Sequence, residues 1–146
     1  NVGGQGEVTL RELVRQALRM RPDRLVVGEV RGVEVVDLLA ALNTGHDGGC
    51  GTVHANSAAD LPARLEALAA PAGMSRAATH SQMASAIALV VHLARGPEGR
   101  RRVAEVGVLV RDADGLAHVP CALRWDAEGR TEVGPAAERL GEVLGD

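Results

Sequence analysis

The chain contains no lysine, no phenylalanine and no tyrosine, and Trp125 is its single tryptophan. All 16 basic residues in the Lys+Arg count are therefore arginine. A phosphate-binding loop of the G-x-x-x-x-G-K-[ST] type requires a lysine, so this sequence contains no such loop. Because aromatic residues are almost absent, the hydrophobic core must consist mainly of valine, leucine and alanine.

Length and charge limit the classes of function. The chain has 146 residues, which is enough for one domain with a moderate hydrophobic core. Its net charge of -3 provides no broad basic surface for a nucleic-acid backbone, so we expect no nucleic-acid partner. Cys50 and Cys121 are far apart and lack C-x-x-C spacing, which favours free thiols in a reducing compartment.

The start of the chain and its apolar runs favour a cytoplasmic protein. The longest apolar run, residues 87–93, is far too short to span a bilayer. The sequence begins at Asn1, without an initiator methionine and without the basic and apolar regions of a signal peptide. We therefore expect a cytoplasmic chain that is a piece of a longer protein.

The first part of the chain alternates helix and strand patterns. Thr9 and Glu12 form a capping box, and the apolar residues that follow at helical spacing predict a helix that ends near Pro22. Residues 25–27 predict a short buried parallel strand. Further helices are expected at residues 33–42, 57–70 (with Ser57 as the N-cap) and 75–86, and further strands at 51–54 and 87–93.

The last part of the chain predicts an antiparallel meander. Residues 103–110 alternate as in a strand, and Asp112-Ala113-Asp114-Gly115 is a strong hairpin turn. Residues 116–125 are expected to pair back as one strand, with a second turn at 126–129 and a short terminal helix at 135–144. The predicted fold class is α/β, with parallel strands and helices followed by this meander and helix.

Glu29 is the first candidate for chemistry. It follows the predicted strand 25–27, and open α/β sheets bind ligands beyond the carboxyl ends of their strands. A carboxylate there can hold Mg²⁺ through water or polarise an attacking water. The structural alternative is an acid that caps the next helix or pairs with a nearby arginine.

Arginines flank the same strand on both sides. Arg31 could contact a phosphate or pair with Glu29. Arg19, Arg21 and Arg24 cluster before the strand, where a guanidinium could reach the phosphate of a neighbouring subunit as an arginine finger. The alternative is a solvated helix end, where the helix dipole favours cations.

A glycine-rich segment carries two histidines, His46 and His54. Their spacing fits no common zinc pattern. A neutral histidine that donates a hydrogen bond to a γ-phosphate is the better functional interpretation, and Thr52, Asn56 and Ser57 could assist it.

Five segments together resemble a known family: residues 6–9, 19–24, 27–32, 43–48 and 52–57. They resemble the secretion ATPases of type II and type IV secretion and of type IV pili, and are closest to the tight-adherence (Flp) pilus assembly ATPase. The resemblance extends from about Gly3 to about Val110.

The resemblance implies roles for individual residues. Residues 27–32 correspond to the Walker B region, and Glu29 would be its catalytic acid, near Mg²⁺ and in contact with it through water. His54 would be the catalytic histidine of the histidine box, beside the γ-phosphate of ATP. The nucleotide or the neighbouring subunit would be contacted by Arg19, Arg21, Arg31, His46 and Thr52.

The resemblance also implies a biological setting. Family members are homohexamers on the cytoplasmic face of the inner membrane, and they couple ATP hydrolysis to protein or pilin export through membrane platform proteins. The Walker A loop and the acidic box that precede Walker B in the family are absent from this chain. Residues 1–111 would therefore be the distal half of a RecA-like P-loop ATPase domain, and residues 112–146 a C-terminal hairpin and helix extension. The chain alone should be inactive.

Two alternatives stay open at this point. The chain could be a degenerate, non-catalytic paralogue that acts as an interaction module of a ring or platform, with its motif residues idle. It could also be a complete small hydrolase or metal enzyme that uses Glu29, His46 and His54.

Overall fold

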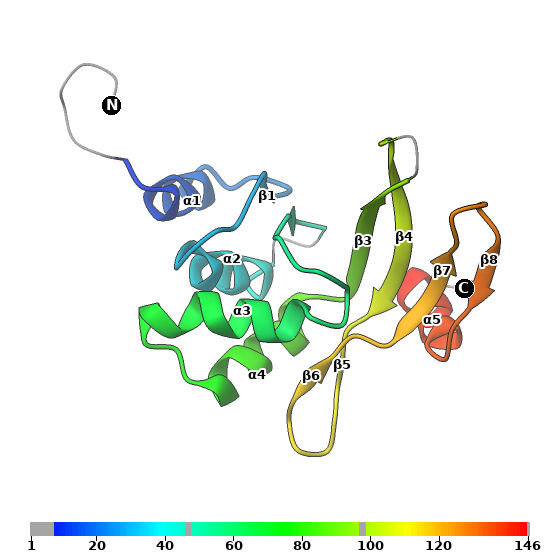
Figure 1. The fold of residues 1–146 in the computed structure, drawn as a ribbon. Coiled ribbons are helices and arrows are strands. Elements are labelled where there is room, and N and C mark those ends of the chain that lie inside the picture. Colours follow the sequence, from blue (N-terminus) through cyan, green and yellow to red (C-terminus); the bar gives the residue numbers. More distant parts are fainter. Residues whose placement is uncertain (1–7, 46–47, 97–98, 146) are drawn as a thin grey trace.

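The computed structural model describes residues 8–45, 48–96 and 99–145. The helices before residue 87 gather on one side of the molecule, and the antiparallel sheet with the C-terminal helix forms the other (Figure 1). The elements in chain order are α1 (Leu10–Arg19), β1 (Val26–Val27), α2 (Glu34–Leu42), β2 (Cys50–Gly51), α3 (Leu61–Ala69), the 3-10 helix η1 (Ala70–Ala72), α4 (Arg76–Ala86), β3 (Leu89–Arg95), β4 (Arg101–Val108), β5 (Val110–Arg111), β6 (Ala117–His118), β7 (Cys121–Trp125), β8 (Thr131–Val133) and α5 (Ala137–Leu144).

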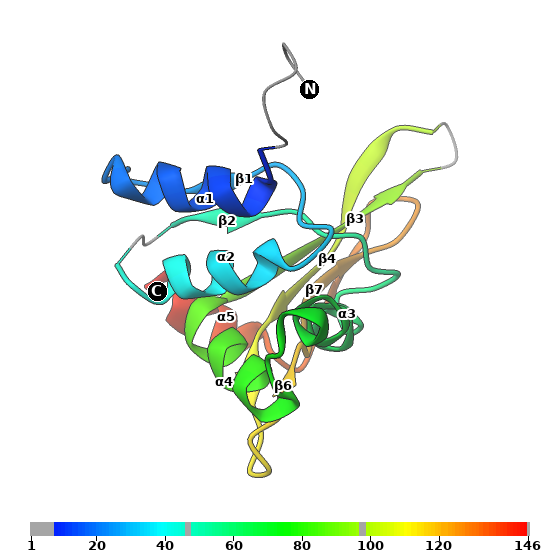
Figure 2. The same ribbon diagram turned by 90° about the vertical axis from the view of Figure 1, so that its left-hand side faces the viewer.

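Helix α1 begins at the predicted capping box and packs on α2. Thr9 accepts a hydrogen bond from the backbone N–H of Glu12, whose carboxylate accepts from the N–H of Thr9 in return. On the other side of α1, Arg11 and Arg15 both pair with Asp37 of α2, at 2.6 and 2.7 Å. The two helices lie one above the other in Figure 2.

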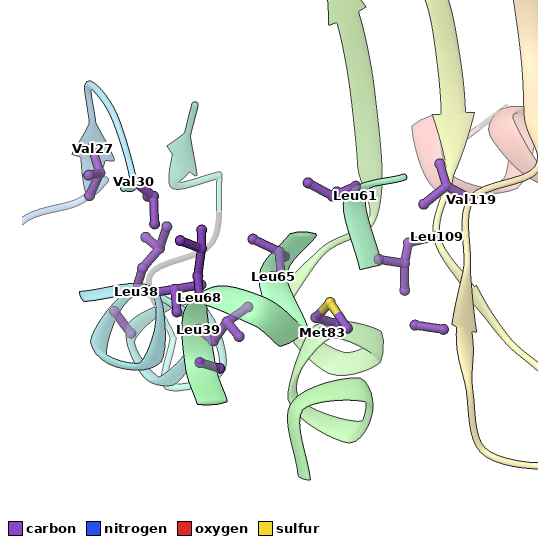
Figure 3. Close-up of a cluster of buried hydrophobic side chains, with 14 of the residues drawn as sticks. Val27, Val30, Leu38, Leu39, Leu61, Leu65, Leu68, Met83, Leu109 and Val119 are labelled. Atoms are coloured by element: carbon purple, nitrogen blue, oxygen red, sulfur yellow. The ribbon is translucent and has the colours of Figure 1, made fainter. Parts of the chain in front are cut away.

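The main core lies among α2, α3 and α4 and extends to the β1 strand (Figure 3). Leu39 of α2 and Met83 of α4 are among its largest fully buried side chains. Leu65 and Leu68 of α3 join them. No aromatic residue belongs to this cluster, as the composition predicts.

The parallel pair β1–β2 is short and positions the loops that follow each strand. Val26 is opposite Cys50, and Val27 is opposite Gly51. Because the strands are parallel, the segments after Val27 and Gly51 leave from the same edge.

The antiparallel sheet has the order β3-β4-β7-β8, and α5 packs on it. Val108, Ala122 and Leu140 form the centre of this second, smaller core. The β5–β6 hairpin, turned at residues 112–115, extends from the end of β4 (Figure 1). The α/β class, the meander and the terminal helix are therefore confirmed.

Three details of the predicted elements are wrong. The strand expected at 51–54 is β2, which ends at Gly51. Helix α3 begins at Leu61, and Ser57 is not its N-cap but accepts the N–H of Asp60 within the preceding turn. The strand expected at 116–125 is divided into β6 and β7, because Pro120 lacks the N–H that a continuous ladder needs. Among the described residues, no helix has both the length and the apolar character to cross a membrane.

Candidate functional site

The candidate site lies where the chain leaves β1 and β2. The N–H of Thr52 donates to the carbonyl of Val27 (3.2 Å), and the N–H of Val30 donates to the carbonyl of Thr52 (2.7 Å). The Thr52 hydroxyl donates to the carbonyl of Gly28. These bonds extend the strand pairing and hold the turn that carries Glu29 beside the segment that carries His54.

Glu29 lies between two cationic or potentially cationic side chains. Its Oε1 is 2.6 Å from Nε of Arg31 and 2.8 Å from Nε2 of His54. This oxygen is buried and makes no hydrogen bond of good angular geometry, so the contacts are ion pairs, the second one only when His54 is protonated. The Glu29 side chain is 28% exposed, whereas those of Arg31 and His54 are 76% and 82% exposed.

Glu29 and Arg31 each stabilise the charged form of the other. The close Arg31 guanidinium lowers the pKa of Glu29; burial opposes this, but the charges of Arg31 and His54 lower the pKa further. The Glu29 carboxylate in turn raises the pKa of Arg31. Glu29 is therefore ionised at neutral pH and available as an acceptor or a metal ligand.

The other predicted site residues have three different outcomes. Thr52 lies against the turn, but its hydroxyl is already bonded to Gly28 and supports the backbone. Arg19 and Arg21 are exposed, and within the described residues neither side chain makes an ion pair or a hydrogen bond. His46 lies outside the described residues. The structure thus joins Glu29, Arg31 and His54 and does not join Arg19 and Arg21 to them.

One acidic residue of the site was not predicted from the sequence. Glu34, the first residue of α2, accepts the backbone N–H groups of Arg31 (2.6 Å) and Gly32 (2.9 Å) with Oε1. An acid at the start of a helix is common because the helix dipole favours it, so the sequence offered no specific signal.

Residues 1–138 match the protein family described as Type II/IV secretion system protein. The chain belongs to this family. The prediction of a secretion ATPase superfamily member is therefore confirmed. The similar proteins described below are named for conjugal transfer and type IV secretion, and the assignment to the tight-adherence pilus branch stays a prediction.

Two curated proteins are similar to most of this chain. A putative conjugal transfer protein of Mycobacterium tuberculosis is 63% identical over 128 residues, covering 88% of this chain and 36% of that protein. The type IV secretion system protein PtlH of Bordetella pertussis is 37% identical over 112 residues, covering 71% of this chain and 32% of PtlH. The chain thus spans about a third of the length of these curated relatives.

A solved structure supports the fold. The crystal structure of the VirB11 ATPase from the Brucella suis type IV secretion system, in complex with sulphate, is similar with a TM-score of 0.62 and 27% identity. The match covers 69% of this chain and 32% of the VirB11 chain. This likeness to an ATPase agrees with the predicted α/β fold class.

Glu29 has the chemistry of a magnesium ligand in a site where a nucleotide provides further oxygen ligands. Mg²⁺ commonly takes one or two protein carboxylates and completes its shell with phosphate and water oxygens. Glu29, ionised and at the site edge, can provide one such carboxylate. Within the part of the chain that the structure describes, no group of three His, Cys, Asp or Glu side chains could hold a metal alone.

Proposed function

We propose that this chain is the Walker B and histidine-box portion of a hexameric motor ATPase that couples ATP hydrolysis to protein or pilin export. The observation that carries the proposal is the meeting of Glu29, Arg31 and His54 at the carboxyl edge of β1 and β2. The family membership and the likeness to a secretion ATPase support it.

The three side chains have complementary tasks in this proposal. Bound ATP would bring phosphate oxygens that compete with Glu29 for Arg31 and His54. Arg31 would pair with phosphate, and His54 would donate a hydrogen bond to the γ-phosphate. Glu29, released from its two partners, would hold a water on Mg²⁺, which neutralises charge on the phosphates when bound.

The full-length protein would act as an oligomer. The protein would form a homohexamer in the cytoplasm, peripheral to the inner membrane, and act on platform proteins of a pilus or secretion system. Arg19 and Arg21, exposed and without ion-pair partners in the described part of the chain, would be free to reach a neighbouring subunit. His46 and Thr52 would lie along the same nucleotide wall. Residues 1–111 would be the partial RecA-like domain, and residues 112–146 an extension.

The chain alone is expected not to hydrolyse ATP. It has no lysine, and the backbone cradle and lysine of a phosphate-binding loop supply much of the affinity for the β- and γ-phosphates. Calorimetric titration of this chain should therefore show no saturable ATP binding at sub-millimolar concentration. Clear saturation would mean that this wall of the site is sufficient for binding.

The decisive experiment uses the full-length protein. Glu29→Gln should leave ATP binding largely intact and suppress hydrolysis, because the neutral amide cannot replace the carboxylate at Mg²⁺. Glu105→Gln is the matched control, since Glu105 is also an acid paired with an arginine (Arg124, 3.1 Å) but lies in the sheet. Unchanged turnover in Glu29→Gln would remove Glu29 from the site.

The gene sequence before Asn1 separates the motor from the idle paralogue. An in-frame G-x-x-x-x-G-K-[ST] motif there supports the motor. A start codon next to Asn1 supports an interaction module with inherited, unused motif residues.

A further inference from the structure

Glu34 is a buried acid that the proposed mechanism does not use. Its residue is 8% exposed, and among the described residues no basic side chain pairs with it. Buried carboxylates are ordinarily paired or accept several hydrogen bonds. Here the carboxylate folds back from the start of α2, and its Oε1 accepts from the backbone N–H groups of Arg31 (2.6 Å) and Gly32 (2.9 Å).

These bonds fix the turn that carries the candidate site. The N–H of Val30 is held by the carbonyl of Thr52 on one side of the turn. The next two N–H groups, of Arg31 and Gly32, are held by Glu34 on the other side. Three consecutive peptide groups are therefore fixed immediately after Glu29, which limits the directions in which Glu29 and Arg31 can project.

Glu34 is suited to this task because it is ionised. Burial alone would raise the pKa of the Glu34 carboxyl, but the backbone N–H groups of Arg31, Glu34 and Gly32 outweigh burial and leave the pKa below its ordinary value. A carboxylate can accept all these bonds at once, and bonds to an ionised acceptor are the stronger kind.

Gly32 is matched to the Glu34 side chain. A Cβ added at Gly32 would lie 3.1 Å from Oε2 of Glu34, which is closer than ordinary van der Waals contact. A side chain at this position would require the carboxylate to shift by a few tenths of an ångström. Glycine at position 32 lets the carboxylate approach the backbone.

We propose that Glu34 is a positioning residue for the nucleotide site: its carboxylate holds the turn 30–32 so that Glu29 faces both Arg31 and His54. This inference rests on the proposed ATPase function, but it concerns the geometry of the cluster and can be tested apart from it. Glu34 itself would not touch ATP.

The kinetic test compares variants of the full-length protein. Glu34→Ala should lower kcat about 10-fold to 100-fold, since small displacements of a catalytic group cost this much, with KM for ATP nearly unchanged. Glu34→Gln should restore most of the activity, because its amide oxygen can still accept both N–H groups. Gly32→Ala, which crowds the carboxylate without removing its charge, should lower kcat in the same direction as Glu34→Ala but by less.

The matched control is Asp37→Asn on the same helix. Asp37 bridges Arg11 and Arg15 and holds α1 on α2 without touching the turn. Asp37→Asn should lower the melting temperature and leave kcat unchanged at a temperature where every variant is folded. An equal loss of kcat in Asp37→Asn, or a Glu34→Gln variant as slow as Glu34→Ala, would overturn the positioning role.

A second measurement does not depend on activity. In this chain, the NMR signal of the His54 imidazole should shift in Glu34→Ala and stay in place in Asp37→Asn and Glu34→Gln. An unchanged His54 signal in Glu34→Ala would refute the positioning role even if ATPase activity were affected. A full-length wild type without ATPase activity would refute the proposed function instead, and the His54 signal would still decide the role of Glu34.

Discussion

His54 Nε2 lies 2.8 Å from Glu29 Oε1, although the whole of α2 and the strand β2 separate the two residues in the chain. The contact depends on the parallel register of β1 and β2, which sends both following segments along one edge. A histidine and a carboxylate this close act as a unit, and their effects on activity should be coupled.

A double-mutant cycle in the full-length protein measures this coupling. Glu29→Gln and His54→Gln should each reduce kcat at least about tenfold, within the usual range for a positioned acid–base or hydrogen-bonding group. The double variant should lose less than the product of the two single losses, because each substitution already breaks the pair. Independent, multiplicative losses would contradict a joint role.

His118→Gln is the control for this cycle. His118 also pairs with a carboxylate, Asp112 at 2.6 Å, but lies on the β5–β6 hairpin. Its replacement should leave kcat unchanged, which separates the site pair from the general effect of removing an exposed histidine.

Sequence patterns single out Glu29 as a candidate but do not predict its contact with His54. Glu29 stood out because it follows a short run of β-branched residues, and strand ends are where α/β proteins bind ligands. The meeting with His54 requires the register Val26 opposite Cys50, which no local pattern determines. Arg31 was left open between a phosphate and Glu29, and the structure pairs it with Glu29.

Competition between hydrogen-bonding groups explains why the predicted start of α3 was wrong. Ser57 had the chemistry of an N-cap, but its hydroxyl bonds to Asp60 in a turn, and α3 starts only at Leu61. Glu34 carries no specific signal in the sequence, and only the contacts of its side chain with the backbone of Arg31 and Gly32 distinguish it.

The pH dependence of stability should report Glu34. Because its folded pKa is below the ordinary value, its ionisation stabilises the folded chain above the unfolded pKa of about 4.3, and this contribution is lost as the pH falls through the folded pKa. Urea unfolding of this chain at a series of pH values should show a smaller loss of stability below about pH 4.3 in Glu34→Gln than in wild type. Asp112 and Asp126, whose pKa values are also lowered, should keep part of the dependence in the variant. Identical pH profiles for the two proteins would contradict the bonds to Glu34.

Met83 should be a major contributor to the core between α3 and α4. It is fully buried, and its replacement by alanine leaves a cavity. Met83→Ala should lower the free energy of unfolding by about 2–5 kcal/mol, measured as a lower urea midpoint with an unchanged m-value. Met20→Ala removes the same atoms from a side chain that is 81% exposed, and it should change stability little. Similar losses in both variants would contradict the described core.

His80 connects α4 to the β5–β6 hairpin, and its removal should loosen that hairpin. The residue is 4% exposed, and its Nδ1 accepts the backbone N–H of Ala117 at 2.8 Å. The imidazole proton must therefore lie on Nε2, which is 3.3 Å from the Glu66 carboxylate. His80→Leu leaves the Ala117 N–H without its acceptor, and an unsatisfied buried donor costs about 1–3 kcal/mol.

Hydrogen exchange at Ala117 tests this connection directly. The Ala117 amide should exchange faster in His80→Leu than in wild type, and by more than the loss of global stability explains, because the hairpin opens locally. His118→Leu is the control, since His118 neighbours Ala117 in the chain but is 55% exposed and points to Asp112. If protection of Ala117 is unchanged in His80→Leu, the histidine does not hold the hairpin, and apolar contacts such as that of Ala117 with the main core are sufficient.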